Sequence, residues 1–172
     1  MRPVQPTGQP VTVRRLGPDD WARFREIRLQ ALAEAPAAFS STLAEALQLD
    51  EAAWRARLAT RAQFLATVSS EAVGTAGGVV TDSGPELISM WVDPQVRGSG
   101  VGDQLVRAVL EWAMHAEYES VLLWVASGNE AAERLYARHG FRRTGASQPM
   151  TEGRPERCEI AMRCDLRRGQ PT

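Results

Sequence analysis

Lysine is absent from this sequence, and neither sign of charge is in excess. All 20 basic residues of the 172-residue chain are arginines, and 21 acidic residues oppose them, giving a formal net charge of -1. A chain with this balance has no overall basic field to attract nucleic acid or an anionic membrane surface. We therefore expect no nucleic-acid partner and no membrane partner, and a small neutral partner fits the balance better.

Cysteine, histidine and long apolar runs are also scarce. The two cysteines, Cys158 and Cys164, lie in one short segment at even separation. In a strand they would share a face about 20 Å apart, far beyond disulfide reach. The two histidines are widely separated, so the spacing supports no metal site. No apolar run approaches the roughly 20 residues of a membrane span, and residues 1–10 contain no apolar signal region. These absences favour reduced thiols and a cytoplasmic location.

The residues that are present suffice for one domain. A hydrophobic content of 44% can build a sizeable core in a chain of this length. We expect a single domain over residues 11–166, with a flexible N-terminal tail at residues 1–10 and a flexible C-terminal tail at residues 167–172.

The pattern of apolar residues predicts that strands and helices take turns along this domain. The predicted strands are residues 11–16, 64–70, 71–81, 86–92, 121–127, 141–147 and 157–166, and the predicted helices are residues 21–35, 43–59, 101–117 and 129–140. This order predicts a fold of the α/β (α+β) class. Its sheet is mixed and mostly antiparallel, with six to seven strands, helices on both faces and a central β-α-β crossover.

Three glycines at alternate positions mark the stretch VDPQVRGSGVG, residues 92–102. Gly98, Gly100 and Gly102 lie where a predicted strand leads into a predicted helix, whose first amides are unpaired and carry the positive end of the helix dipole. Glycine lets a phosphate approach those amides because no Cβ intervenes. The stretch lacks the endings of a P-loop and of the dinucleotide fingerprint. It indicates a diphosphate cradle, with a flexible turn and helix cap as the alternative.

A second motif, NEAAERLYARHGF at residues 129–141, follows the glycine turn along the chain. Together the two motifs resemble the GCN5-related N-acetyltransferase family. The family's phosphate-binding pattern is Gln or Arg, two residues, Gly, one residue, then Gly or Ala, and it fits at residues 95–100 and again at 97–102. The family's second hallmark is present as Asn129, Ala132, Leu135, Tyr136, Gly140 and Phe141. With the matching order of elements, the resemblance covers residues 11–166.

The resemblance implies that acetyl-CoA is the co-substrate and that no metal is involved. The pyrophosphate is expected on the amides of residues 98–103, and the pantetheine beside the predicted strand at residues 86–92. In the family this strand and the next one splay apart at a bulge, where free backbone groups bind the pantetheine amides. The implied cofactor-binding residues are Met90, Trp91, Val92, Arg97, Gly98, Ser99, Gly100, Val101, Gly102, Asp103, Asn129 and Tyr136.

The implied reaction is attack of a neutral amine on the thioester carbonyl. By resemblance, the backbone N–H of Val92 stabilises the oxyanion, a contribution of about 2 to 4 kcal/mol for one such donor in other acyl-transfer enzymes. Tyr136 occupies the family's general-acid position, and a phenol with a pKa near ~10 can protonate the departing thiolate. The branch that modifies protein N-termini carries a glutamate as the base where this chain has Trp124. Glu86 is therefore the candidate base, and a water chain is the alternative.

Each of these residues also has a plain structural interpretation. Asn129 is a good N-cap for the helix that follows it, and Tyr136 can pack its ring against the sheet. Arg97 can be a surface charge on a turn, and Glu86 can be a solvated residue after Gly84. The sequence leaves both sets of interpretations open.

The acceptor is expected to bind near residues 35–51 and 147–156. Four acids in or near these segments offer a site for a cationic amine, with two aromatic residues as an apolar wall: Glu45, Asp50, Glu51 and Glu152, with Phe39 and Trp54. The alternative is that these acids are solvated helix faces.

We therefore predict an acetyl-CoA-dependent N-acetyltransferase acting on a primary amine of a small molecule by direct attack in a ternary complex. The alternatives are a protein or peptide N-terminal acetyltransferase and a non-catalytic acyl-CoA-binding regulatory module. A homodimer is also an expectation, since dimers across the terminal strands are common in similar proteins.

Overall fold

The computed structural model describes residues 9–150 and 156–166, which form seven strands and five α helices. The strands are β1 (Val11–Leu16), β2 (Ala62–Val68), β3 (Glu71–Thr81), β4 (Gly84–Val92), β5 (Ser120–Ala126), β6 (Arg142–Pro149) and β7 (Cys158–Asp165). The helices are α1 (Trp21–Glu34), α2 (Leu43–Leu47), α3 (Glu51–Ala59), α4 (Val101–His115) and α5 (Glu130–Arg138), with a 3-10 turn, η2, at Pro36–Ala38. Except for positions 9 and 10, the predicted tails lie outside the described residues.

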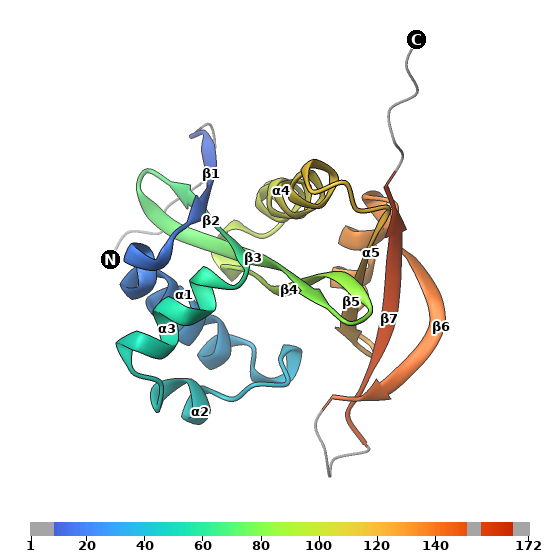
Figure 1. The fold of residues 1–172 in the computed structure, drawn as a ribbon, viewed down its shortest axis with the longest axis horizontal. Coiled ribbons are helices and arrows are strands. Elements are labelled where there is room, and N and C mark those ends of the chain that lie inside the picture. Colours follow the sequence, from blue (N-terminus) through green and yellow to red (C-terminus); the bar gives the residue numbers. More distant parts are fainter. Residues whose placement is uncertain (1–8, 151–155, 167–172) are drawn as a thin grey trace.

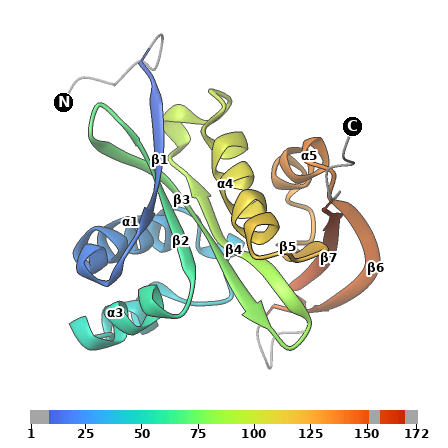
Figure 2. The same ribbon diagram turned by 45° about the horizontal axis from the view of Figure 1, so that its top comes forward.

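All seven strands belong to one sheet, in the order β1-β2-β3-β4-β5-β7-β6. Neighbouring strands are antiparallel except β4 and β5, which are parallel and joined through α4. Helices α1 to α3 lie on one side of the sheet and α4 and α5 on the other (Figure 1), and the turned view shows α4 lying along the central strands (Figure 2). The predicted fold class, a mixed and mostly antiparallel sheet with helices on both faces and a β-α-β crossover, is confirmed.

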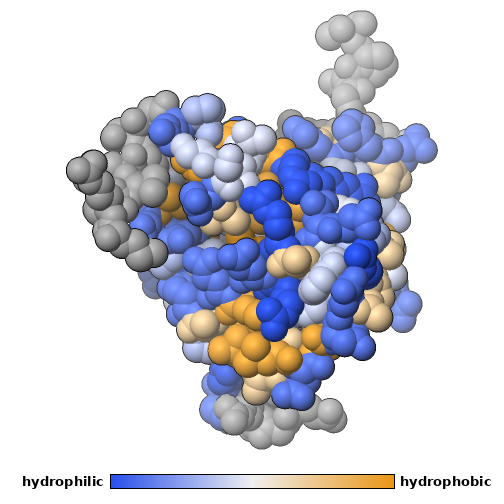
Figure 3. Space-filling model, turned by 90° about the vertical axis from the view of Figure 1, so that its left-hand side faces the viewer, coloured by the Kyte–Doolittle hydropathy of each residue, from blue (hydrophilic) through white to orange (hydrophobic). Residues whose placement is uncertain are grey.

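Each face of the sheet has its own hydrophobic core. On one face α4 contributes Leu105, Val106 and Val109, which recur at helical spacing and are fully buried against the strands. On the other face Phe24 of α1 and Trp54 of α3 pack edge to face, with their ring centroids 5.4 Å apart. The outward side of the molecule at α1 and α3 is mostly hydrophilic (Figure 3), as expected of helices that bury only one stripe. The two cores hold the central strands between them.

The single helix predicted at residues 43–59 is two helices, so this prediction was wrong. Asp50 is extended, with φ −83° and ψ 176°, and its side chain accepts a hydrogen bond from the amide of Ala53, which starts α3. Thr42 starts α2 in the same way, and the carboxylate of Glu45 accepts a hydrogen bond from the amide of Thr42. The capping signals of Asp50 therefore outweigh the continuous apolar pattern. No described helix is long and apolar enough to cross a membrane.

The centre of the sheet is split between β4 and β5. The two strands pair only at Glu86 with Leu122 and at Leu87 with Leu123. Beyond that point the pairing of β4 with β3 contains a bulge, because Ser89 and Met90 together oppose one residue of β3. Ser89 has φ 56°, in the left-handed region that non-glycine residues rarely adopt. The structure thus contains both the bulge and the strand separation that the family resemblance implied.

Candidate active site

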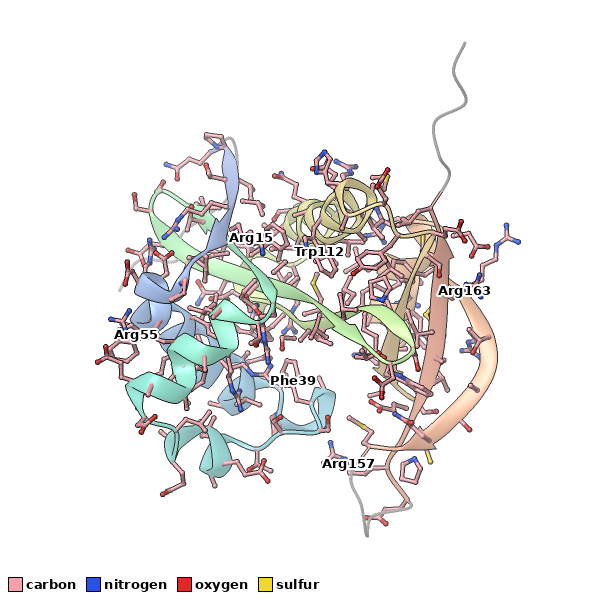
Figure 4. All side chains as sticks on the ribbon, viewed as in Figure 1. Arg15, Phe39, Arg55, Trp112, Arg157 and Arg163 are labelled. Carbon is pink, nitrogen blue, oxygen red and sulfur yellow. The ribbon has the colours of Figure 1, made fainter. Side chains whose placement is uncertain are left out.

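A cleft of about 1430 Å³ opens at this split and continues along both faces of the sheet. On one side it is lined by the glycine turn before α4 and by α5, and on the other by α1, α3 and the loop around η2. We refer to these two parts as the cofactor half and the acceptor half of the cleft. The side chain of Phe39 lies in the acceptor half, between the helical layer and the strands (Figure 4).

The glycine turn presents bare backbone to the cofactor half. Gly98 and Gly100 have φ values of 80° and 90°, and a Cβ built on either would meet no atom within 4 Å. The first hydrogen bond of α4 runs from the amide of Gln104 to the carbonyl of Gly100. The amides of the preceding three residues therefore have no acceptor within the helix and lie at its positive end. A pyrophosphate fits this surface, because the glycines have no Cβ that would obstruct its approach to the amides.

Gly102 serves packing instead. A Cβ on Gly102 would lie 3.0 Å from Cδ2 of Leu135 and 3.5 Å from Cε of Met90. The missing side chain lets α4, α5 and β4 approach one another closely. The amide of Gly102 remains among the free first-turn donors.

Two of the predicted cofactor residues have side chains that are engaged elsewhere. The indole Nε1 of Trp91 donates to Oε2 of Glu34 at 2.8 Å, and the indole is buried on the face covered by α1 to α3. Arg97 donates from Nη2 to the same oxygen at 2.8 Å and from Nε to the carbonyl of Val92 at 2.9 Å. Trp91 thus offers the cofactor only its backbone, and a contact of Arg97 with phosphate stays a prediction. Glu34, which joins these groups to α1, gave no signal in the sequence.

Asp103 and Ser99 also make contacts within the protein. Asp103 lies 2.8 Å from Nε2 of His139 and accepts from Arg138 at 3.2 Å, which ties the start of α4 to the end of α5. Burial alone would raise the pKa of Asp103, but the hydrogen bonds and positive charges of Arg138 and His139 outweigh it and lower that pKa. The hydroxyl of Ser99 donates to the carbonyl of Val96. Of the two residues, only Asp103 has an amide that is available to a phosphate, because the amide of Ser99 donates to the same Val96 carbonyl at 3.3 Å.

Tyr136 and Asn129 line the cleft from α5 and from its N-terminus. Tyr136 is only 6% exposed, and its ring packs edge to face against Phe141 at 5.8 Å. Burial raises the pKa of Tyr136, so its hydroxyl is neutral at pH 7 and retains its proton. The side chain of Asn129 accepts a hydrogen bond from the amide of Ala132 at 3.2 Å, so it has the N-cap role considered from the sequence.

Two carboxylates line the cleft, Glu86 near the start of β4 and Glu159 near the start of β7. Glu86 accepts a hydrogen bond from the hydroxyl of Thr81 at 3.1 Å, and Glu159 of β7 accepts one from Gln148 at 2.8 Å. Burial raises the pKa of Glu159, the hydrogen bond from Gln148 opposes this, and the charge of Glu86 raises it further. Trp124 lines the cleft beside them. Glu159 was not predicted from the sequence, because only the pairing of β5 with β7 brings it to this place.

The acids expected to hold a cationic amine have structural roles. Glu45 and Asp50 cap helices, and Glu51 pairs with Arg55 at 2.7 Å. Trp54 is fully buried against Phe24, so the expectation that it forms an apolar wall was wrong. Glu152 lies outside the described residues. The acceptor half is lined instead by three arginines, which the sequence interpretation had missed: Arg28, Arg57 and Arg61.

Comparison with known proteins identifies the family. The family model described as "Acetyltransferase (GNAT) family" matches residues 23–141. The mouse protein named "Probable N-acetyltransferase family 8 member 5" is 33% identical over 130 residues, covering 71% of this chain and 56% of that protein. Rat N-acetylaspartate synthetase is 44% identical over 66 residues, which are 38% of this chain and 22% of that protein. The chain therefore spans less than a quarter of this last relative.

Solved structures agree with the family match at the level of the fold. An acetyltransferase of the GNAT family from Streptococcus pneumoniae superposes with a TM-score of 0.76 at 19% identity, covering 92% of this chain and all of that one. The yncA protein of Salmonella typhimurium, solved with its cofactor acetyl-CoA, has a TM-score of 0.72 at 22% identity, covering 95% of this chain and 98% of that one. By its sequence match and its architecture, this chain belongs to the GNAT family of acetyltransferases.

Proposed function

We propose that this chain transfers the acetyl group of acetyl-CoA to a primary amine of a small molecule by direct attack in a ternary complex. The observation that carries the proposal is the split between β4 and β5, which joins the bare glycine turn and the acceptor half in one cleft. Two reactants entering from opposite halves would meet at the bulge of Ser89 and Met90. Holding both reactants in such a meeting place lowers the entropic part of the barrier.

The cofactor half is proposed to bind acetyl-CoA and to supply a proton to the departing thiolate. When bound, acetyl-CoA provides the thioester carbonyl that the amine attacks. The amides at the start of α4 hold its pyrophosphate, and the amide of Val92 at the end of β4 is the proposed donor to the oxyanion. Tyr136 lines the same cleft with a raised pKa, so it stays protonated until a thiolate needs its proton. These roles use the chain's own groups and need no metal ligand.

The base that takes the proton of the amine is proposed to be Glu86. It lines the cleft at the start of β4, and its hydrogen bond with Thr81 fixes its position. Glu159 lines the same cleft, and the charge of Glu86 contributes to raising its pKa. A water chain between them and the amine is the alternative.

A small acceptor is favoured over a protein N-terminus by the shape of the acceptor half. Arg157, next to β7, donates to the carbonyls of Pro36 and Ala37 at 3.4 and 2.9 Å, and so ties the β6–β7 end of the sheet to the η2 loop (Figure 4). Ala38 and Phe39, which follow these carbonyls, line the acceptor half, so the tie holds one wall of that half in place. The name of several relatives, N-acetylaspartate synthetase, describes the formation of a small N-acetylated amino acid.

The proposal is tested by following thiol release from acetyl-CoA with a panel of amino acids, polyamines, aminoglycosides and short peptides, with calorimetry of acetyl-CoA binding on the same sample. Turnover of a small amine above that of the peptides supports it. Binding of acetyl-CoA without turnover of any amine would favour the non-catalytic binding module, and faster turnover of peptides would favour the N-terminal acetyltransferase. Failure to bind acetyl-CoA would contradict the assignment of the glycine turn.

A further inference from the structure

The acceptor half carries a concentration of positive charge that the fold does not use. Arg28 lies on α1, Arg57 on α3 and Arg61 directly before β2, and all three line the cleft. They come from three separate elements on the face of the sheet that α1 to α3 cover. Arg28 is 6% exposed, and the other two are partly buried.

Within the part of the chain that the structure describes, these three guanidinium groups have no carboxylate partner. In residues 9–150 and 156–166 no carboxylate oxygen lies within 4.0 Å of any of them. Four acids on or beside the neighbouring helices are engaged by other groups: Glu34 by Trp91 and Arg97, Glu45 and Asp50 by backbone amides, and Glu51 by Arg55. The cluster therefore presents about three positive charges to the cleft, since arginine is always protonated at pH 7.

Burial makes this arrangement costly in the free protein. Nη1 of Arg28 and Nε of Arg61 are buried donors without a hydrogen-bond partner among the described residues. Burial and, to a smaller extent, the positive charges of Arg57 and Arg61 together lower the pKa of Arg28 to about 10. Burial and the charge of Arg57 also lower the pKa of Arg61. A buried charge with unpaired donors destabilises a fold unless a ligand satisfies it.

Aromatic rings fix the orientation of two of these groups without using their donors. The guanidinium of Arg28 stacks over Phe39 at 4.6 Å from the ring centroid, and that of Arg57 lies 5.4 Å from the ring centroid of Trp54. A stacked guanidinium keeps its N–H groups in the plane of the fork, where they match the two oxygens of a carboxylate. The site is thus positioned in advance for an anion.

We propose that Arg28, Arg57 and Arg61 bind the carboxylates of the amine acceptor, and that the acceptor is a dicarboxylic amino acid. The inference rests on the proposed acetyl transfer and names its substrate class. Guanidinium groups pair with carboxylates through two parallel hydrogen bonds. One carboxylate would leave most of the positive charge uncompensated, whereas two compensate most of it. Glu86 and Glu159, which line the same cleft, provide the negative end toward which the amino group points.

The first test compares acceptors that differ in charge but little in shape. Thiol release is measured with L-aspartate and L-glutamate, with their amides L-asparagine and L-glutamine, and with β-alanine and γ-aminobutyrate, which retain one carboxylate. We expect kcat/KM for one dicarboxylic acid to exceed that of its amide by about 100-fold, because each lost charge-assisted pair costs about 10- to 100-fold. Equal turnover of acids and amides would overturn the proposal and leave the acetyl transfer intact.

The second test removes the arginines singly. Arg28→Gln and Arg61→Gln should raise the KM for the dicarboxylic acid about 10- to 100-fold, with kcat changed only a few-fold and acetyl-CoA affinity unchanged. Arg55→Gln is the matched control. Arg55 lies on α3, as Arg57 of the cluster does, but it pairs with Glu51 and Asp19 and does not line the cleft. An unchanged KM in both cleft variants would overturn the proposal.

Calorimetry separates failure of this inference from failure of the proposed function. L-aspartate and L-glutamate are titrated into the wild type and into Arg28→Gln in the presence and absence of CoA. If acetyl-CoA does not bind, the proposed function fails. The titration of the two amino acids without CoA then still shows whether the arginines bind carboxylates. Binding that weakens at least about tenfold in Arg28→Gln supports the site. No binding of either amino acid to the wild type overturns it.

Discussion

The cofactor half and the acceptor half of the cleft present their ligand-binding groups in different ways. The cofactor half exposes backbone amides at the glycine turn, while its charged side chains are paired, Asp103 with Arg138 and Arg97 with Glu34. In the acceptor half arginine side chains line the cleft, and buried donors of Arg28 and Arg61 have no hydrogen-bond partner within the described residues. A backbone site suits a cofactor with an invariant diphosphate, whereas a side-chain site can be changed by single substitutions. The difference indicates where the chain's substrate specificity resides.

The largest effect is expected from Tyr136→Phe. The hydroxyl is the proposed proton donor to the departing thiolate, and losing a general acid typically lowers kcat by about 10²- to 10⁴-fold. Acetyl-CoA affinity, measured by calorimetry, should change less than about twofold because the amides of the glycine turn are untouched. Tyr118→Phe is the control, since Tyr118 is the chain's other tyrosine and packs against Trp112 away from the cleft. A kcat equal to that of the control would show that the acid is another group.

A smaller effect, confined to the cofactor half, is expected from Gly100→Ala. Gly100 has φ 90°, a conformation that costs an L-residue about 1 to 2 kcal/mol, so alanine favours a different backbone conformation of the turn that presents the free amides. Acetyl-CoA binding should weaken about tenfold or more. Gly17→Ala is the matched control, because Gly17 has φ −103° and open space around it. If both variants bind acetyl-CoA like the wild type, the cofactor half does not bind through these amides.

In the acceptor half, one substitution is expected to leave the stability of the free protein unchanged or to increase it. Arg28→Met removes a buried, unpaired charge and keeps an unbranched side chain over Phe39. The melting temperature of the ligand-free protein should stay the same or rise by about 2–4 °C, which corresponds to about 1 kcal/mol in a protein of this size. Scanning calorimetry without ligand measures it. A fall in melting temperature of the same size would mean that the guanidinium stabilises the free fold.

The smallest effect is expected from Asp103→Asn, which breaks a paired charge in the cofactor half. The pKa of Asp103 is lowered in the folded protein, so its carboxylate stabilises the fold above its unfolded pKa and loses that contribution as the pH falls through the lower folded value. The variant should therefore be less stable than the wild type at pH 7 by about 1 kcal/mol or less. Denaturant unfolding from pH 7 downward should show the two converging below about pH 4. A difference that does not depend on pH would contradict the role of this charge.

The sequence predicted the cofactor half because that half is built from local features. Glycine spacing, a strand before it and a helix after it are all contiguous in residues 92–102, and the backbone follows from them. The division of the helix at Asp50 was missed because one capping hydrogen bond outweighed a continuous apolar pattern. Glu34 and Glu159 were missed because only tertiary packing brings them to the cleft.

The acids at residues 45, 50 and 51, which the sequence analysis considered for a cationic amine, do not line the acceptor half, whereas three arginines do. The sequence contains acids at residues 45, 50 and 51, but capping and ion pairing commit them to the helices on which they lie. Arg28, Arg57 and Arg61 are distant enough along the chain that no spacing rule connects them. These arginines are unpaired because tertiary packing places the nearby carboxylates against other groups. The spacing of residues along the chain does not show which groups will pair. The expected homodimer and cytoplasmic location remain predictions.

The most direct test of the difference between the two halves is a crystal structure of the Tyr136→Phe variant with acetyl-CoA and L-glutamate or L-aspartate. The account predicts the pyrophosphate on the amides of residues 101–103, with the side chain of Asp103 still paired with Arg138. It predicts the amino acid's carboxylates on Nη1 of Arg28 and Nε of Arg61, with the amino group toward Glu86. A cofactor held elsewhere, or an amino acid whose carboxylates do not contact these arginines, would contradict it.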